Sequence, residues 1–416
     1  MRSVDLCDIV LEALEIARPT AALAVLQPLL AQHLQATEVR LLMANYQLTA
    51  LHPIHDRENS VAFSDTPAGS AFVDQEPVTR DVPEQGVEVY LPMSTRGDRM
   101  GVLQLLLPSH PDPTQLAELV SLARTIALSL RAASRQTDAL ERSGRTQRLT
   151  LAAELQWQLL PGRGCRAPEY NIAGHLEPAY HVHADAFDWS QDDDHLTLTL
   201  VDGSNGEGVH ALLSTLTLTA LRNARRAGLS IADQALLADQ AVYAHHQGNQ
   251  CVSALLLRID LSTGLADVVL AGSPRLLILR DGQVYEPRLT EQVPLGMFED
   301  NDYVEQYLAF AHGDRVLMVS DGVHDARSTG SDRFGDVRLS DLMSATAQGS
   351  AEQVVRRVVD ELYEHRGEND LDDDAVVLCL DWSGPGSALA GAESTSRESP
   401  VELAAWGPKL RAVTSR

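Results

Sequence analysis

Hydrophobic and polar positions alternate between helical and strand-like spacing, and the sharpest change lies near the middle of the chain. From Leu196 to Val201, leucine and threonine alternate, which is the period of a strand with one face on a core and the other toward something polar. The run ends in the segment DGSNGEG, residues 202–208, and helical spacing begins at Val209. The pattern predicts a strand, a glycine-rich turn and a helix. Asp202 either forms the turn or helps to bind a hard cation that the glycines allow the backbone to approach.

The region before this centre predicts a small α/β domain at residues 1–132. Strand-like spacing occurs at residues 40–48, and Val87–Leu107 is typical of two apolar strands joined by a tight hairpin at Arg96-Gly97-Asp98. After Pro113 apolar residues recur at helical spacing. Such a domain serves either as a sensor or only as a dimerisation platform.

Helical spacing continues from Ser121 to Leu160, where Pro161 stops it. Arginines recur along this stretch and are typical of a solvated face on an acidic chain. The apolar stripe favours a parallel coiled coil, which transmits a change from one domain to the next. We therefore expect residues 133–161 to form a helical, coiled-coil-like linker and to join two copies in a homodimer.

Composition narrows the classes of function. A chain of 416 residues with 44% hydrophobic residues predicts two or three domains with packed cores. With 58 acidic and 33 basic side chains the net charge is -25, which argues against nucleic acid as a partner and favours a protein or a metal-bound anion. The four cysteines form no C-x-x-C pair and are expected to be reduced. No apolar run reaches the roughly 20 residues of a membrane span and no signal peptide is predicted, so we expect a cytoplasmic protein.

From residue 162 onward the chain is richer in strands, and acidic residues stand at four separate strand edges. They are Asp185, Asp202, Asp321 and the run Asp372-Asp373-Asp374. Carboxylates that converge raise one another's pKa unless cations neutralise them, and a two-metal oxygen site accounts for them economically. Because neither a cysteine pair nor a spaced histidine pair is present, Mn²⁺ or Mg²⁺ suits these oxygen ligands better than zinc.

The order of these segments resembles the PPM-type metal-dependent protein serine/threonine phosphatases, in the bacterial branch called SpoIIE-like. Seven ordered motifs over about residues 150–382 carry the resemblance: Leu155-Gln156 with Leu159-Leu160-Pro161, Ala184–Asp188, Asp202–Gly208, Ala271–Pro274, Val293–Gly296, Gly313–Arg327 and Asp372–Leu378. The resemblance implies an α/β/β/α sandwich at residues 162–383.

The resemblance also implies a metal site and a reaction. Two Mn²⁺ or Mg²⁺ ions would be held by six groups: Asp185, Asp202, the backbone carbonyl of Gly203, Asp321, Asp372 and, as the second choice of register, Asp373. Asp202, Asp185 and Asp321 would then carry catalysis, in which a water activated by both metals attacks the phosphate without a phospho-enzyme. The implied substrate is a phosphoserine or phosphothreonine of a regulatory protein, typically an antagonist of an anti-sigma factor in partner switching.

Several positions depart from the family pattern. His183-Ala184 replaces two glycines before Asp185, and Gly206-Glu207-Gly208 replaces Gly-His-Gly. Ser273 stands in place of a histidine, and His324-Asp325 in place of Thr-Glu. Every metal-ligand position is nevertheless acidic, which favours an enzyme, either slow or gated by a partner. Histidines that could act as general acid are His183, His210, His245, His246 and His324.

The N-terminal region resembles a GAF domain in its hairpin and final helix, which implies a sensory module for a small-molecule or protein signal. After Trp382 the composition turns to Ser, Gly, Ala and Glu, and residues 384–416 are predicted to be disordered. Two other functions stay open. One is a catalytically idle, PPM-like scaffold that binds a phosphoprotein. The other, a nucleotidyl cyclase, fits poorly because it needs its metal aspartates close together in one βααβ unit.

Overall fold

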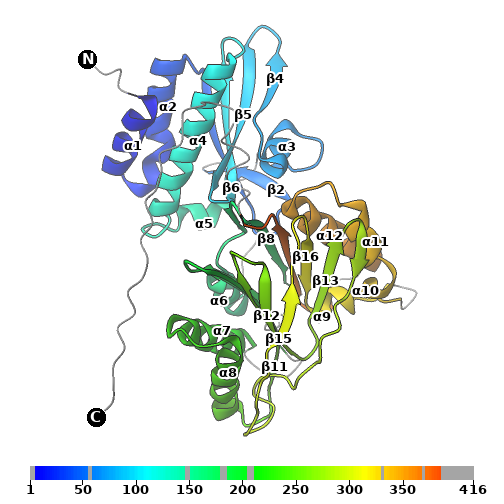
Figure 1. The fold of residues 1–416 in the computed structure, drawn as a ribbon. Helices are drawn as coiled ribbons and strands as arrows, with labels where there is room; N and C mark the ends of the chain where they lie inside the picture. The colour runs from blue at the N-terminus through cyan, green and yellow to red at the C-terminus, as the bar shows by residue number, and fades with distance from the viewer. Residues whose placement is uncertain are drawn as a thin grey trace, which may run out of the picture.

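The computed structural model describes residues 5–54, 59–145, 150–178, 185–203, 210–328, 332–367 and 371–385, and these residues form two sheet-containing units (Figure 1). The chain from 179 to 184 and from 204 to 209, including His183-Ala184 and Gly206-Glu207-Gly208, lies outside the described residues, as does the tail from 386. None of the described helices is both long enough and apolar enough to cross a membrane.

The N-terminal unit is a six-stranded antiparallel sheet in the order β3-β2-β1-β6-β5-β4 with helices on both faces. Its elements are α1 (Leu6–Ile16), a 3₁₀ turn (Pro19–Ala21), α2 (Ala22–Leu34), β1 (Glu38–Ala44), β2 (Ala50–Pro53), β3 (Val61–Ala62), α3 (Pro67–Asp74), β4 (Val78–Val82), β5 (Gly86–Thr95), β6 (Asp98–Leu107), α4 (Pro113–Ala133) and α5 (Ala139–Ser143). The predicted α/β pattern and the predicted hairpin at residues 87–107 are confirmed.

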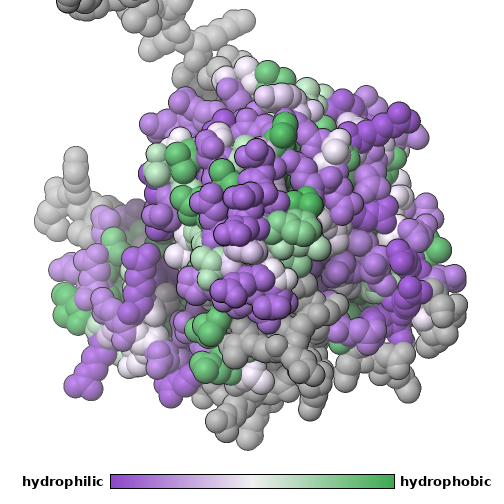
Figure 2. Space-filling view, turned by 90° about the horizontal axis from the view of Figure 1, so that it is seen from below, coloured by the Kyte–Doolittle hydropathy of each residue, from purple (hydrophilic) through white to green (hydrophobic). Residues whose placement is uncertain are grey.

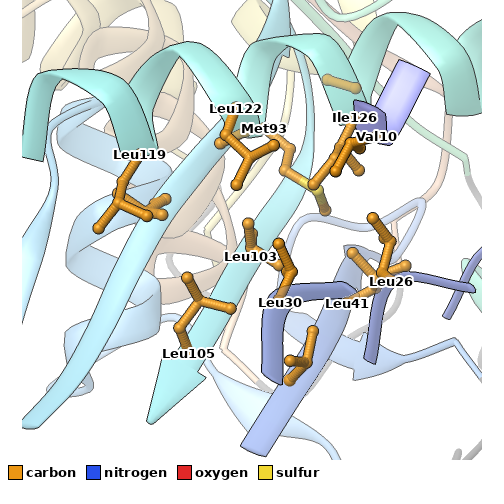
Figure 3. Close-up of a cluster of buried hydrophobic side chains, with 14 of the residues drawn as sticks. Val10, Leu26, Leu30, Leu41, Met93, Leu103, Leu105, Leu119, Leu122 and Ile126 are labelled. Carbon is orange, nitrogen blue, oxygen red and sulfur yellow. The ribbon is translucent and has the colours of Figure 1, made fainter. Parts of the chain in front are cut away.

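Alternating side chains of the sheet build two cores in this unit. On one face, Leu41, Leu103 and Leu105 pack against α1, α2 and α4, and Figure 3 shows Leu119, Leu122 and Ile126 of α4 pointing into this core. On the other face, α3 packs over Leu42 and Val102, where the rings of Phe63 and Phe72 stack 4.8 Å apart. Both faces of the sheet are therefore filled with side chains.

The predicted continuous helix from Ser121 to Leu160 is wrong. Helix α4 ends at Ala133, the short helix α5 follows, and a separate helix α6 covers Leu151–Leu159. The chain turns after α4 because Leu140 of α5 is buried in the core of the N-terminal unit, and α6 begins anew where the side chain of Thr150 caps its first turn. A single long apolar stripe is thus not formed, and dimerisation through residues 133–161 stays a prediction.

The C-terminal unit contains two antiparallel sheets. One has the order β15-β12-β11-β10-β9 and the other β14-β13-β16-β17-β8-β7. The strands are β7 (Gly164–Ala167), β8 (Tyr170–Glu177), β9 (Ala186–Gln191), β10 (His195–Gly203), β11 (Val252–Asp260), β12 (Leu265–Ala271), β13 (Arg275–Arg280), β14 (Gln283–Tyr285), β15 (Gln306–Ala309), β16 (Arg315–Val319) and β17 (Ala375–Trp382). The helices are α6, α7 (His210–Arg226), α8 (Ile231–His246), α9 (Asp321–His324), α10 (Phe334–Val337), α11 (Leu339–Ala345) and α12 (Ala351–Arg366).

Three hydrophobic cores arrange these elements in four layers. Leu198 of β10 and Leu378 of β17 belong to the core between the two sheets. A second core joins α7 and α8 to the outer face of the five-stranded sheet, and a third joins α9–α12 to the outer face of the six-stranded sheet. The layers are therefore α/β/β/α, as predicted. The sequence pattern predicted that the threonines of β10 face a polar environment. Thr197 and Thr199 are instead buried, because α7 and α8 cover the outer face of this sheet.

The two units contact each other through the β5–β6 hairpin and α12. At the hairpin tip Gly97 adopts a φ of 90°, and a Cβ there would lie 2.9 Å from the backbone nitrogen of Arg166 in β7. Arg99 of β6 pairs with Glu352 of α12 at 2.9 Å, and the two side chains are only 8% and 11% exposed. Sheet backbone and a buried ion pair thus fix one unit against the other.

The Arg99→Met variant is expected to lose about 3 kcal/mol of unfolding free energy, because it leaves the buried carboxylate of Glu352 without its cation. Removing both partners, in an Arg99→Met/Glu352→Leu variant, should restore most of this loss. The exposed pair between Arg40 and Glu38 provides the control, since Arg40→Met should cost less than about 1 kcal/mol. Urea unfolding of the variants measures the differences, and equal costs at Arg99 and Arg40 would contradict the assignment.

Candidate metal centre

The chain places four acidic segments at one end of the two stacked sheets. Asp202 is the second-last residue of β10. Asp185 directly precedes β9, the strand that pairs with β10 in the five-stranded sheet. Asp321 opens α9 directly after β16, and Asp373 and Asp374 precede β17 in the six-stranded sheet. Both sheets therefore contribute acidic residues at the same end of the sandwich.

Hydrogen bonds of ordinary length hold two of these carboxylates against neighbouring segments. The backbone N–H of Gly203 donates to Asp185 Oδ1 at 3.1 Å. The backbone N–H of Asp321 donates to Asp202 Oδ2 at 3.0 Å, and the hydroxyl of Ser273 donates to the same oxygen at 3.1 Å. These contacts join Asp202 of one sheet to Asp321 beside the other.

The carboxylates share an electrostatic environment that disfavours their charged forms. Burial, and then the charges of Asp202, Asp374 and Asp373, raise the pKa of Asp185 well above its usual range. Burial and the charge of Asp321 raise the pKa of Asp202 to about 8, and burial and the charge of Asp373 raise that of Asp321 to about 6. Cations at this place would reverse all three shifts.

The residues fit a divalent metal in their donor atoms. Asp185 Oδ2 and Asp321 Oδ1 are buried oxygens that have no hydrogen-bond partner among the described residues. The set consists of carboxylates with the Gly203 backbone beside them, which are ligands that Mg²⁺ and Mn²⁺ prefer. Within the described ranges, however, no three His, Cys, Asp or Glu side chains stand close enough to enclose an ion as they are placed.

Asp372, the first choice of register from the sequence, is not brought to this cluster. Its side chain is 85% exposed and accepts a hydrogen bond from Arg366 Nη1 at 2.9 Å. Asp374 is instead fully buried and accepts a hydrogen bond from Gln156 at 2.6 Å, and the charges of Asp374 and Asp373 contribute to the raised pKa of Asp185. The strand β17 begins at Ala375, so these three aspartates lie just before it, where strand alternation does not set their directions.

Two residues that hold the acidic segments in place were not predicted as site residues from the sequence. Gln156 of α6 is fully buried, and its amide donates to the backbone carbonyl of Asp185 at 2.7 Å and to Asp374 Oδ2 at 2.6 Å. The hydroxyl of Ser320 accepts from the backbone N–H of Val376 at 2.9 Å and thereby holds the start of β17 beside α9. The motif Leu155-Gln156 was the available signal for Gln156, whereas nothing in the local pattern marks Ser320.

Of the candidate histidines whose side chains the structure describes, His324 lies on α9, the helix that Asp321 opens. It is buried on α9, with Nε2 at 3.1 Å from the carbonyl of Ser273 and Nδ1 at 3.1 Å from Asp325. His245 is exposed on α8 and pairs with the carbonyl of Ala241, and His246 is the next residue along the same helix. His183 and the side chain of His210 lie outside the described part of the chain.

The pKa of about 8 at Asp202 predicts that metal-free protein loses stability as the pH rises from about 4 to about 8. Over this window the folded state keeps a proton that the unfolded state has released, so the stabilising contribution is complete below pH 4 and is lost through pH 8. Chemical unfolding in EDTA at pH 5 and pH 8 measures it, with Asp202→Asn as the control for other groups. An identical pH dependence in both proteins would show that Asp202 does not titrate in this range.

Comparison with known proteins identifies the class of the C-terminal unit. Residues 192–383 match the family described as Stage II sporulation protein E (SpoIIE). The match covers a little under half of the chain and includes Asp202, Asp321 and Asp373. This part of the chain is therefore similar to SpoIIE-type phosphatase domains.

A named relative is the phosphoserine phosphatase RsbP of Bacillus subtilis (strain 168), which is 22% identical over 218 residues, 51% of this chain and 52% of the relative. The match thus spans about half the length of that protein. Among solved structures, the SiaA-PP2C domain of Pseudomonas aeruginosa aligns at 22% identity with a TM-score of 0.45, covering 51% of this chain and 84% of that one. The phosphatase domain of SpoIIE from Bacillus subtilis with a fragment of its regulatory domain aligns at 16% identity and a TM-score of 0.45, covering 52% and 65%.

Proposed function

We propose that this protein is a metal-dependent protein serine/threonine phosphatase. Its substrate would be a phosphoserine or phosphothreonine on a regulatory protein, most specifically an antagonist of an anti-sigma factor in partner switching. The observation that carries the proposal is a group of carboxylates, within a SpoIIE-like domain, whose burial and mutual charges raise their pKa; two of their oxygens, Asp185 Oδ2 and Asp321 Oδ1, have no hydrogen-bond partner among the described residues. An array of this kind is stable in its charged form only beside cations.

Each residue has a defined part in this proposal. Asp185, Asp202, the backbone carbonyl of Gly203, Asp321 and Asp373 would hold two Mn²⁺ or Mg²⁺ ions. When bound, such a pair of ions supplies charge stabilisation for the phosphate and lowers the pKa of water. Ser273 and the backbone of Asp321 orient the Asp202 carboxylate, and His324, on the helix that Asp321 opens, would donate a proton to the leaving oxygen.

We further propose that the N-terminal unit acts as a GAF-like sensor and gates the site through α6. Gln156 of this helix holds both the Asp185 backbone and Asp374, so a small displacement of α6 would move two acidic segments together. The C-terminal end of α6 is held by Arg222, which donates to the carbonyl of Leu159 at 2.6 Å and to Asp188 at 2.7 Å. A signal that repositions α6 would therefore change the affinity for metal.

One observation favours the second candidate, an idle phosphoprotein-binding scaffold. The described carboxylates do not enclose an ion as placed. The scaffold function predicts that the site binds no metal at millimolar Mn²⁺ or Mg²⁺. The phosphatase function predicts that metal binds, lowers the pKa of the carboxylates and displaces their protons.

Phosphate release from a phosphoserine peptide and from p-nitrophenyl phosphate tests the proposal with the full chain. We expect turnover with Mn²⁺, loss of turnover in EDTA, and recovery when Mn²⁺ is returned. Asp202→Asn and Asp321→Asn should each lower the rate by at least about 10²-fold, since each removes a metal ligand. Absence of turnover at every metal concentration, together with absence of Mn²⁺ binding by calorimetry, would favour the scaffold.

A further inference from the structure

The loop between β14 and β15 returns to the end of the sandwich that holds the acidic cluster. There it contacts two strands of the five-stranded sheet. Gln292 forms a bridge with Ala271 at the end of β12, and Leu295 forms one with Val252 at the start of β11. The backbone N–H of Val252 donates to Leu295 at 2.9 Å, and that of Leu295 donates to Val252 at 2.8 Å. Backbone hydrogen bonds thus join the loop to the ends of both strands.

Both of these strand ends lie beside Asp202. In the antiparallel pair of β10 and β11, Val252 lies opposite Gly203. Ser253 lies opposite Asp202 in the same pair. Just beyond β12, the hydroxyl of Ser273 donates to Asp202 Oδ2 at 3.1 Å. A displacement of the loop would therefore reach Asp202 by two routes, through β11 and through Ser273.

Two glycines allow the loop to approach its neighbours closely. A Cβ at Gly272 would lie 2.3 Å from Ser253 Oγ and 3.2 Å from Cγ of Pro294 in the loop. A Cβ at Gly296 would lie only 2.2 Å from Val242 Cγ1 of α8. Their φ angles of 82° and 80° also favour glycine. The loop is therefore packed tightly between the strand ends and α8.

One buried carboxylate of α8 holds the second half of the loop. Asp239 is fully buried, and its Oδ1 accepts from the backbone N–H of Gly296 at 2.7 Å and from the amide of Asn301 at 2.9 Å. It also accepts from the hydroxyl of Tyr303 at 3.0 Å, which lies 3.2 Å from the carbonyl of Val293 as well. Hydrogen bonds to a carboxylate are stronger than those between neutral groups. Asp239 thus ties three separate points of the loop to one helix.

Apolar packing secures only part of the loop. Leu295 and Tyr303 are buried in the core with α7 and α8, whereas Met297 and Phe298 are 40% and 54% exposed. Figure 2, which views the molecule from the bottom of Figure 1, likewise shows hydrophobic residues scattered among hydrophilic ones. Exposed hydrophobic side chains scattered in this way are ordinary surface. The polar contacts with Asp239 are therefore what holds the stretch between the two buried residues.

We propose that Asp239 is a positioning residue of the acidic cluster. By fixing the loop at residues 292–303, it sets the places of Asp202 and Gly203. The consequence for metal binding rests on the proposed function, whereas the consequence for the ends of β11 and β12 does not. The sequence around Asp239 shows only helical spacing, so its role arises from contacts with residues more than fifty positions away.

Calorimetric titration of the full chain with Mn²⁺ tests the consequence for metal binding. We expect Asp239→Ala to weaken Mn²⁺ binding about tenfold, because it leaves three donors without their acceptor and releases the support of a metal ligand. Asp239→Asn keeps an oxygen acceptor but loses its charge, so the loss should be only about threefold. This partial rescue separates a role of the acceptor from a general defect at this position.

Asp314→Ala is the matched control. Asp314 is 1% exposed and likewise holds a turn, since its Oδ2 accepts from the backbone N–H of Ala311 at 2.7 Å and its Oδ1 from Arg280 at 2.8 Å. It precedes β16, whereas Asp321 follows that strand, so Asp314 lies at the opposite end of the sheet. Its loss should leave Mn²⁺ affinity within about twofold of wild type. Equal Mn²⁺ affinities in Asp239→Ala and Asp314→Ala would overturn the proposal.

Hydrogen exchange in EDTA tests the positioning without metal. Exchange should be faster than in wild type in peptides that span residues 251–256 and 270–275 of Asp239→Ala, and unchanged there in Asp314→Ala. Tyr303→Phe, which removes a single donor, is the milder variant and should show a smaller increase if Asp239→Ala does not fold. Unchanged exchange in these peptides would refute the positioning. If the wild-type chain bound no Mn²⁺, the proposed function would fail, and the exchange measurement would still decide whether Asp239 positions the strand ends.

Discussion

Replacing Asp373 by asparagine is expected to abolish metal-dependent phosphate release, with a loss of at least about 10²-fold. Burial raises the pKa of both Asp185 and Asp321, and the charge of Asp373 adds to both increases. Its loss would leave the metal beside Asp321 with one fewer charged oxygen. The measurement is the initial rate on a phosphoserine peptide over a range of Mn²⁺ concentrations, and a ligand role predicts a raised Mn²⁺ requirement as well as a lower rate.

Asp372→Asn is the matched control, because it makes the same chemical change one residue earlier. Its carboxylate is 85% exposed, and a hydrogen bond from the buried Arg366 lowers the pKa of Asp372. We expect a rate within about twofold of wild type, since the side chain points to solvent and asparagine keeps an oxygen that can accept from Arg366. A larger loss in Asp372→Asn than in Asp373→Asn would mean that the ligand register is the one first chosen from the sequence.

Gly322→Ala is expected to lower the free energy of unfolding by about 3 kcal/mol. A Cβ at Gly322 would lie 1.9 Å from the backbone oxygen of Asp374, so α9 or the start of β17 must move. Since Asp321 and Asp373 belong to these two segments, the variant should also weaken Mn²⁺ binding. Urea unfolding gives the first quantity and calorimetric titration the second.

Gly228→Ala separates this steric effect from the general cost of losing a glycine. Gly228 has a φ of 74° and no atom within 4 Å of its missing Cβ, so alanine there should cost only about 1 kcal/mol and leave Mn²⁺ binding unchanged. If the two variants were equally stable, the close approach between α9 and residue 374 would not constrain the site.

Local patterning was sufficient for much of the fold. The alternation at residues 196–201 and the hairpin at 87–107 appear as β10 and as β5 with β6. The period of the side chains and the geometry of the turn specify these strands, and both depend only on neighbouring residues. They could therefore be predicted from short stretches of sequence. The same pattern placed Asp202 and Asp321 at strand ends, where the structure finds them.

The helical spacing at residues 121–160 predicted one continuous helix, whereas the structure has three separate ones. Spacing does not reveal which hydrophobic core each apolar residue packs in. Leu140 packs in the N-terminal core, whereas Ala153 and Gln156 are buried in the C-terminal unit. The burial of side chains in two separate cores outweighs the modest cost of ending a helix and starting another. Periodicity alone carries no information about this choice.

By itself, the sequence determined which chemistry is available: oxygen ligands, no paired cysteines, and acidic residues at four strand edges of a SpoIIE-like domain. Only the tertiary structure decided which carboxylates meet. It left Asp372 beside Arg366, buried Asp374, and brought Gln156 of α6 against both the Asp185 backbone and Asp374. The physical reason is that these contacts join residues far apart in the chain, and their distances are set by how sheets and helices pack rather than by local sequence.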